Sequence, residues 1–135
     1  MKGIDISKLD GNPIKQWIRA YDSRTDRNYI VGVMVGCCLD GENGEKLFNA
    51  DYALCNGEYD AFDPDMAIKI AYGRARAARP NRAKRNVVRR DCGWKGSGVD
   101  IREEFSKFIE RCQTYYKDCR PTGKANAFYC IKTEK

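Results

Sequence analysis

The side chains best suited to chemistry in this chain are basic, and they are concentrated in one segment. Between residues 74 and 95, which we call the arginine-rich segment, there are nine Lys or Arg residues and one acid, Asp91, a net charge of +8. The whole chain has 25 basic and 19 acidic residues, a net charge of +6, so the remainder carries −2. A positive charge this local is what binding of a phosphate-bearing ligand requires.

We predict the ligand-binding side chains within this segment. Guanidinium groups match the geometry of phosphate oxygens, and a tryptophan beside a lysine can stack on a base or cover a loop. A tryptophan more commonly packs in the core. A second interpretation also remains open, in which the arginines form a solvated helix end or pair with the acidic first half of the chain. The predicted residues are Arg74, Arg76, Arg79, Arg82, Arg85, Arg89, Arg90, Trp94 and Lys95.

The chain contains no histidine. This excludes Ser-His-Asp and Cys-His nucleophilic machinery, histidine general bases and histidine-ligated metals. Carboxylates, Lys, Tyr and Cys remain available, so catalysis is not excluded. No catalytic constellation is recognisable, however, and we expect a binding protein rather than an enzyme, with no catalytic residue, metal or cofactor.

Seven cysteines occur without any C-x-x-C pair. Zinc sites usually show paired ligands at short spacing, so we expect most of these cysteines to be buried as small hydrophobic residues. The sequence has no run of 18 apolar residues and no signal-peptide pattern, which predicts a cytoplasmic protein that does not enter a membrane. A disulfide framework would conflict with that location. The cysteines are Cys37, Cys38, Cys55, Cys92, Cys112, Cys119 and Cys130.

Three strands are predicted in the first half of the chain. Residues 29–39 are almost continuously apolar and β-branched, as in a central strand, and residues 46–56 return after a turn at 40–45. Residues 14–22 fit a strand or a single amphipathic helix, and we prefer the strand. Residues 1–13 fit an edge strand or a tail. Gly32 and Gly36 share a face of the central strand, where they would let a helix or another backbone approach closely.

A helix is predicted from Asp63 to Pro80. Asp63 is suited to capping it, Pro64 suits its first turn, and Pro80 cannot continue it. Arg74 projects from the middle of its apolar stripe, where a charge needs a partner. In one interpretation, it lies at the edge of the core or pairs with a carboxylate. In the other, it lies at a subunit or domain seam and presents its donors to an anionic ligand. The carboxylates considered are Asp51, Asp60 and Asp63.

A second amphipathic helix is predicted over residues 100–119, with possible strands at 85–94 and 125–132. This order indicates an α+β fold in one domain, residues 1–135, with a single antiparallel sheet of four or five strands and two helices packed on one face. The glycines and Arg74 leave a self-complementary surface plausible, which favours a homo-oligomer.

The chain also resembles a recurrent pattern. Small accessory proteins of bacteriophages often carry a strand that ends in Cys, then Phe-Asp, then a helix that ends in Ile-Ala-x-Gly-Arg-Ala. The resemblance covers roughly a sixth to a fifth of the chain. The matching residues are Cys55, Phe62, Asp63, Ile70, Ala71, Gly73, Arg74 and Ala75.

This resemblance implies a phage-type anti-defence or accessory protein, located in the host cytosol. Some proteins of this kind sequester nucleotide immune signals, and we expect this activity here. The alternatives are a nucleic-acid-binding protein that uses its basic patch, or a direct protein inhibitor of a host nuclease or CRISPR-type effector. The expected partner is therefore a nucleotide signal, a nucleic acid or a host defence protein.

Overall fold

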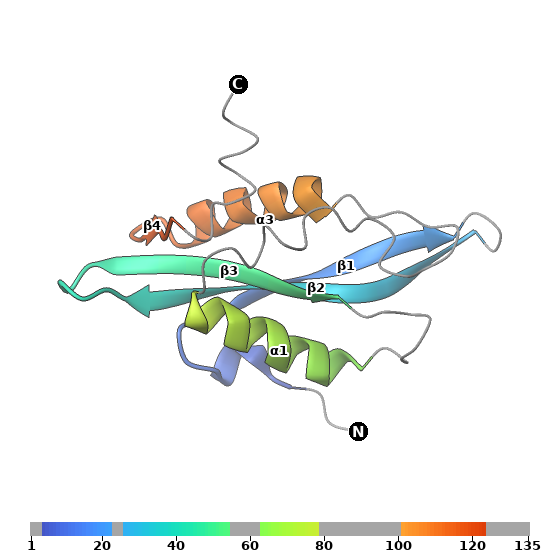
Figure 1. Ribbon diagram of the computed structural model, residues 1–135, viewed down its shortest axis with the longest axis horizontal. Helices are drawn as coiled ribbons and strands as arrows, with labels where there is room; N and C mark the ends of the chain where they lie inside the picture. Colours follow the sequence, from blue (N-terminus) through green and yellow to red (C-terminus); the bar gives the residue numbers. More distant parts are fainter. Residues whose placement is uncertain (1–3, 23–25, 55–62, 79–100, 124–135) are drawn as a thin grey trace.

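A four-stranded sheet lies between two helices in the computed structural model of the chain (Figure 1). The structure describes residues 4–22, 26–54, 63–78 and 101–123. Within these ranges no helix is long and apolar enough to cross a membrane. The elements are η1 (Ile6–Lys8, a 3-10 turn), β1 (Ile14–Asp22), β2 (Arg27–Asp40), β3 (Lys46–Leu54), α1 (Pro64–Ala77), α3 (Ile101–Tyr115) and β4 (Arg120–Pro121).

The strands follow the order β1-β2-β3-β4 across the sheet. β1 pairs antiparallel with β2, and β2 antiparallel with β3. β4 is short and runs parallel to β3, with Leu47 opposite Arg120 and Phe48 opposite Pro121. The predicted α+β fold with a four-stranded sheet is confirmed, and the sheet is mixed rather than wholly antiparallel. The difference arises because the chain leaving α3 meets the edge of β3 in the direction of that strand.

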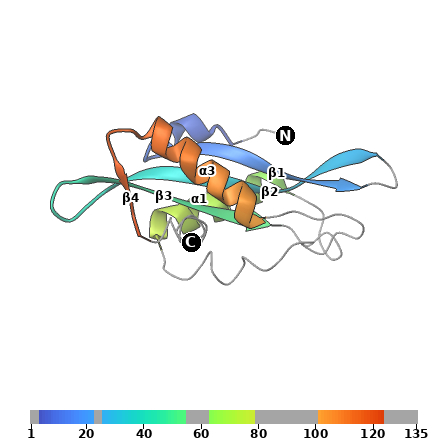
Figure 2. The same cartoon turned by 90° about the horizontal axis from the view of Figure 1, so that it is seen from above.

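The two helices cover opposite faces of the sheet, so the prediction that both lie on one face is wrong. Figures 1 and 2 show α3 on one side of the strands and α1 on the other. The physical reason lies in β2, where residues 31–37 are all buried. Successive side chains of a strand point to opposite faces, so a strand that is apolar at every position needs a cover on each side.

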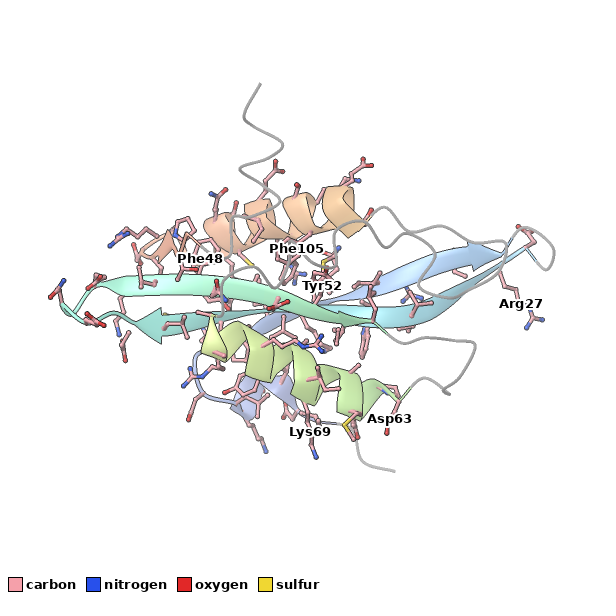
Figure 3. The ribbon with its side chains drawn as sticks, viewed as in Figure 1. Arg27, Phe48, Tyr52, Asp63, Lys69 and Phe105 are labelled. Carbon is pink, nitrogen blue, oxygen red and sulfur yellow. The ribbon has the colours of Figure 1, made fainter. Side chains whose placement is uncertain are left out.

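Aromatic side chains fill the layer between α3 and the sheet. In Figure 3, Phe48 and Tyr52 of β3 point toward the helix that carries Phe105. The rings of Tyr52 and Phe105 meet edge to face with centroids 5.6 Å apart, and Phe48 stacks on Tyr116 at the same separation. Such pairs hold α3 on the sheet through buried area and ring geometry together.

Two glycines of β2 permit close approach, as their spacing predicted. A Cβ atom built at Gly36 would lie 2.7 Å from Cys112 Sγ of α3. A Cβ atom built at Gly32 would overlap the carbonyl oxygen of Ala53 in β3. Helix α3 therefore approaches the sheet closely at Gly36, and the backbone of β3 approaches closely at Gly32.

The start of α1 follows the prediction. The Asp63 carboxylate accepts hydrogen bonds from the backbone N–H groups of Asp65, at 3.1 Å, and Met66, at 3.2 Å. Pro64 is the first helical residue, where its missing N–H has no partner to lose. The helix ends at Ala77, and Ala78 takes a left-handed conformation with φ of 51°.

Other boundaries differ from the predictions. α3 ends at Tyr115 rather than at residue 119, and the chain turns over residues 116–118 toward β4. The Tyr116 hydroxyl lies 2.8 Å from the carbonyl oxygens of both Asn12 and Gly36, which fixes the chain on the sheet at this turn. Residues 6–8 form η1, where an edge strand or a tail was predicted, while the strand over 14–22 is confirmed. The predicted strands at 85–94 and 125–132 lie outside the described residues.

Candidate anion-binding arginines at the end of α1

Two of the nine predicted ligand-binding residues, Arg74 and Arg76, belong to the part of the chain that the structure describes. Both lie in the last turn of α1, where their charges complement the negative end of the helix dipole. The other seven predicted residues lie outside the described ranges: Arg79, Arg82, Arg85, Arg89, Arg90, Trp94 and Lys95.

Arg74 is half-buried and reaches the edge of the sheet. Its Nη1 atom donates a hydrogen bond to the carbonyl oxygen of Tyr52 at 3.0 Å. The carbonyl of Phe48, four residues earlier in β3, accepts from the backbone N–H of Thr122 at 3.0 Å. Carbonyls at even spacing point to the same edge of a strand, so Tyr52 presents its oxygen where pairing with β4 has ended. Arg74 thus contacts the edge of β3 beyond its pairing with β4.

Polar side chains of β3 lie under α1, on the face of the strand opposite to Phe48 and Tyr52. Asn49 is 2% exposed, and its Nδ2 atom donates to the carbonyl oxygen of Ala75 at 3.0 Å. That carbonyl belongs to the last turn of α1, where helix carbonyls lack an intrahelical partner. The side-chain oxygen of Asn49 accepts from the Thr122 hydroxyl. Asn49 therefore joins α1 to the chain that follows β4.

The carboxylates proposed as partners of Arg74 have different environments. Asp51 is 4% exposed on the α1 face of β3, and its Oδ1 atom accepts from the backbone N–H of Tyr52 at 2.7 Å. Asp63 caps the opposite end of α1 and does not serve Arg74. Asp60 lies outside the described residues. The hydrogen bond to Tyr52 gives Arg74 a structural role, which is the first of the two interpretations considered for it.

Arg76 is exposed and lies over a tyrosine ring. Its guanidinium carbon is 5.9 Å from the ring centroid of Tyr72, one helical turn earlier. The Tyr72 hydroxyl donates to the carbonyl oxygen of Asp10 at 2.8 Å, which ties the ring to the loop before β1. A Cβ atom built at Gly11 would lie 2.7 Å from Arg76 Nη1, so the guanidinium also approaches this loop. Tyr72 was not predicted, but its position four residues before Arg76 is the signal that could have found it.

The two arginines leave α1 in different directions. They are two residues apart, which is about 200° around a helix. Arg74 reaches the β3 edge, whereas Arg76 lies beside the loop before β1. The described part of the arginine-rich segment therefore does not converge on one small pocket. The guanidinium of Arg74 is hydrogen-bonded to the sheet, whereas that of Arg76 is exposed.

Burial disfavours the thiolate form of the two fully buried cysteines in the described ranges. Burial raises the pKa of Cys37 to about 12, although the Arg76 charge acts in the opposite direction. Burial likewise raises the pKa of Cys112 to about 12. A thiol with such a pKa carries almost no thiolate, which is the reactive form. Within the described ranges, no group of three or more Cys, Asp or Glu side chains is arranged to hold a metal ion.

No protein-family model matches the chain, and neither a curated protein nor a solved structure is significantly similar to it.

Proposed function

We propose that this protein binds a phosphate-bearing ligand through its arginine-rich segment, which begins in the last turn of α1. The observation that carries the proposal is the concentration of charge, nine basic residues against one acid over residues 74–95. Charge gathered in one segment raises the local concentration of anions, while the same charge spread over a surface does not. The segment is attached to a helix that the sheet holds in place.

Arg76 is the described residue best suited to begin such a site. Its side chain is exposed, and Tyr72 holds it from one side, so its fork of N–H donors can meet a phosphate with little loss of freedom. Arg74 contributes to the local potential, but its Nη1 atom already serves Tyr52. Ligand contacts are therefore expected from Arg76 and the residues that follow it.

Two kinds of ligand fit this chemistry. A nucleotide immune signal, sequestered by a phage-type anti-defence protein in the host cytoplasm, is supported by the resemblance of residues 55–75 to phage accessory proteins. A single-stranded nucleic acid is the second candidate. It is favoured by the spread of the basic residues along positions 74–95, because an extended polyanion can contact arginines that do not share one pocket.

Native mass spectrometry of the protein purified from cells is the first test. A stoichiometric adduct of nucleotide mass would support sequestration and identify the ligand. If no adduct is present, a labelled single-stranded RNA is titrated at several salt concentrations, since binding through phosphates releases counterions and weakens as salt rises. If neither a nucleotide nor RNA binds, the proposal is wrong, and the chain would be tested as a direct inhibitor of a host nuclease.

Replacing Arg76 with Ala is expected to weaken RNA binding by about threefold to tenfold and to reduce the salt slope by about one unit. The matched control is Lys117→Ala, which removes an exposed positive charge just beyond the end of α3. Fluorescence anisotropy of the labelled RNA measures both variants. Equal losses in the two variants would contradict a site at α1 and would indicate attraction by net charge alone.

We also propose that the protein self-associates through the outer face of α1. Exposed residues at alternating spacings of four and three follow this face, which lies opposite the sheet. Met66 and Ile70 are large and are 52% and 39% exposed, whereas Gly73 and Ala77 are small. We call them the outer stripe: Met66, Ile70, Gly73 and Ala77.

A second copy of the same helix complements the outer stripe when the two run antiparallel about a twofold axis. Met66 of one copy then meets Ala77 of the other, and Ile70 meets Gly73, so large side chains fill the space left by small ones. The first turn of α1 is acidic and the last turn basic, so antiparallel pairing also brings opposite charges together. One helix pair buries less surface than a stable dimer needs, so the expected association is weak.

Replacing Ile70 with Lys is expected to abolish this association, because two ammonium groups would face each other near the axis. Sedimentation equilibrium over the micromolar range measures it. The control is Tyr115→Lys, since Tyr115 is 50% exposed on α3, beyond the other face of the sheet. A wild-type protein that stays monomeric throughout, or equal association of the two variants, would exclude the outer stripe as the interface.

A further inference from the structure

Two thiols from distant parts of the chain lie in contact on the α3 side of the sheet. The Sγ atoms of Cys38 and Cys119 are 3.6 Å apart, although the residues are separated by 81 positions in sequence. Both are free cysteines, and both are partly buried against the core between α3 and the sheet. Spacing along the sequence gave no sign of this pair, since neither residue belongs to a C-x-x-C motif.

The fold holds both residues in place. Cys38 lies near the end of β2, directly opposite Phe48 in the register of β2 and β3. Phe48 in turn pairs with Pro121 of β4, two residues after Cys119. The backbone N–H of Cys119 donates to the carbonyl oxygen of Tyr116 at 2.8 Å, so the turn after α3 is closed. Sheet register and this turn together fix the distance between the thiols.

We propose that Cys38 and Cys119 form a reversible disulfide by exchange with a low-molecular-weight disulfide such as oxidised glutathione. The sulfur atoms need to approach from 3.6 Å to about 2.0 Å, which side-chain rotation and a small backbone adjustment can supply. The site is independent of the arginine-rich segment and of the proposed ligand.

The exchange takes place in two steps. One protein thiolate attacks a sulfur of oxidised glutathione, forming a mixed disulfide and releasing one glutathione thiolate. The second protein thiolate then attacks the protein sulfur of the mixed disulfide, closing the internal bond and releasing the second glutathione thiolate. The two protons lost by the cysteines end on the two glutathione thiols. The protein dithiol is oxidised by two electrons, and the glutathione disulfide is reduced by the same two.

The surroundings select this pair over the other described thiols. Cys37 precedes Cys38 but lies in the core under α1, on the other face of the sheet, and Cys112 is fully buried in α3. Burial, and then the hydrogen bond with Cys38, raises the pKa of Cys119, while the nearby Lys46 ammonium acts in the opposite direction. Because exchange needs the thiolate, it is expected to be faster under mildly alkaline conditions.

The bond would tie β2 to the chain that follows α3, on the face where α3 packs. It closes a loop that contains β3, α1 and α3, and so restricts the unfolded chain strongly. A reducing cytoplasm keeps such a pair as thiols, and oxidation closes it. The protein would therefore become harder to unfold when its surroundings turn oxidising.

Peptide mapping after equilibration in glutathione buffers tests the proposal. The wild-type chain is equilibrated under oxidising and reducing conditions at mildly alkaline pH, quenched with acid, and digested without reduction. Trypsin leaves Cys37 and Cys38 together in residues 28–46 and Cys119 in residues 118–124. A cross-linked pair of these peptides, two hydrogens lighter than their sum, is expected under oxidising conditions. The same cross-link in Cys37→Ala assigns the bond to Cys38.

Thermal unfolding supplies the second measurement. Oxidation is expected to raise the melting temperature by about 5–10 °C in the wild type and in Cys37→Ala. The increase should disappear in Cys38→Ala and in Cys119→Ala. Mapping that finds only glutathione adducts, or a bond between other cysteines, overturns the proposal. A melting temperature that rises equally in all four proteins would also overturn the proposal.

Discussion

Replacing Gly36 with Val is expected to lower the free energy of unfolding by about 3 kcal/mol, because it overfills a tightly packed layer. Even a single Cβ atom at this position would lie 2.7 Å from Cys112 Sγ and 3.6 Å from the rings of Phe108 and Tyr116. The Gly36 carbonyl also lies 2.8 Å from the Tyr116 hydroxyl, so the strand cannot move away without loss of this contact. Guanidinium unfolding followed by circular dichroism measures the change.

The control for this prediction is Gly73→Ala in α1. Among the described atoms, nothing lies within 4 Å of a Cβ built at Gly73. Alanine at an exposed helical position should therefore stabilise the protein by about 0.5–1 kcal/mol. The pair of variants separates packing from backbone propensity, since each replaces one glycine. If Gly36→Val were as stable as the wild type, α3 could not pack against β2 as described.

Replacing Arg74 with Ala is expected to lower the free energy of unfolding by about 2–3 kcal/mol. The substitution removes the donor that serves the Tyr52 carbonyl, and it removes a half-buried apolar stem. The edge of β3 beyond β4 would lose this contact, which also favours pairing with another chain. Chemical unfolding measures the stability, and light scattering at raised temperature measures the aggregation.

The matched variant is Arg76→Ala, which changes the same residue type two positions further along α1. Because Arg76 is exposed, its removal should alter stability by no more than about 0.5 kcal/mol. The expected outcome is a division of roles, with Arg74 supporting the fold and Arg76 supporting ligand binding. If Arg74→Ala instead kept wild-type stability and abolished binding, Arg74 would be a site residue, as its position in the apolar stripe first suggested.

The start of α1 and the three long strands could be predicted because their signals are local in the sequence. The start of α1 depends on Asp63 and Pro64, which act on the backbone groups next to them, and the structure confirms it. The strands over residues 14–22, 29–39 and 46–56 were predicted within a few residues, because alternation and β-branched runs are local properties. The close approach at Gly36 was also predictable, since only glycine leaves that space.

The prediction that both helices lie on one face overlooked a signal that was present in the sequence. Residues 31–37 form an unbroken apolar run, and such a run indicates a strand covered on both faces. Placing both helices on one side would have left half of these side chains in water. The amphipathic pattern of each helix indicates only that the helix has a core-facing stripe, and not which face of the sheet it covers.

Local sequence patterns thus determined the three long strands, the two helices and the concentration of charge from residue 74 onward. They did not determine which side chains meet. The parallel β4, the bond from Arg74 to the Tyr52 carbonyl and the contact of Cys38 with Cys119 all join residues that are far apart in sequence. Such contacts depend on how the helices pack on the sheet and on strand register, because the folded chain, and not the spacing along it, sets the distance between two side chains.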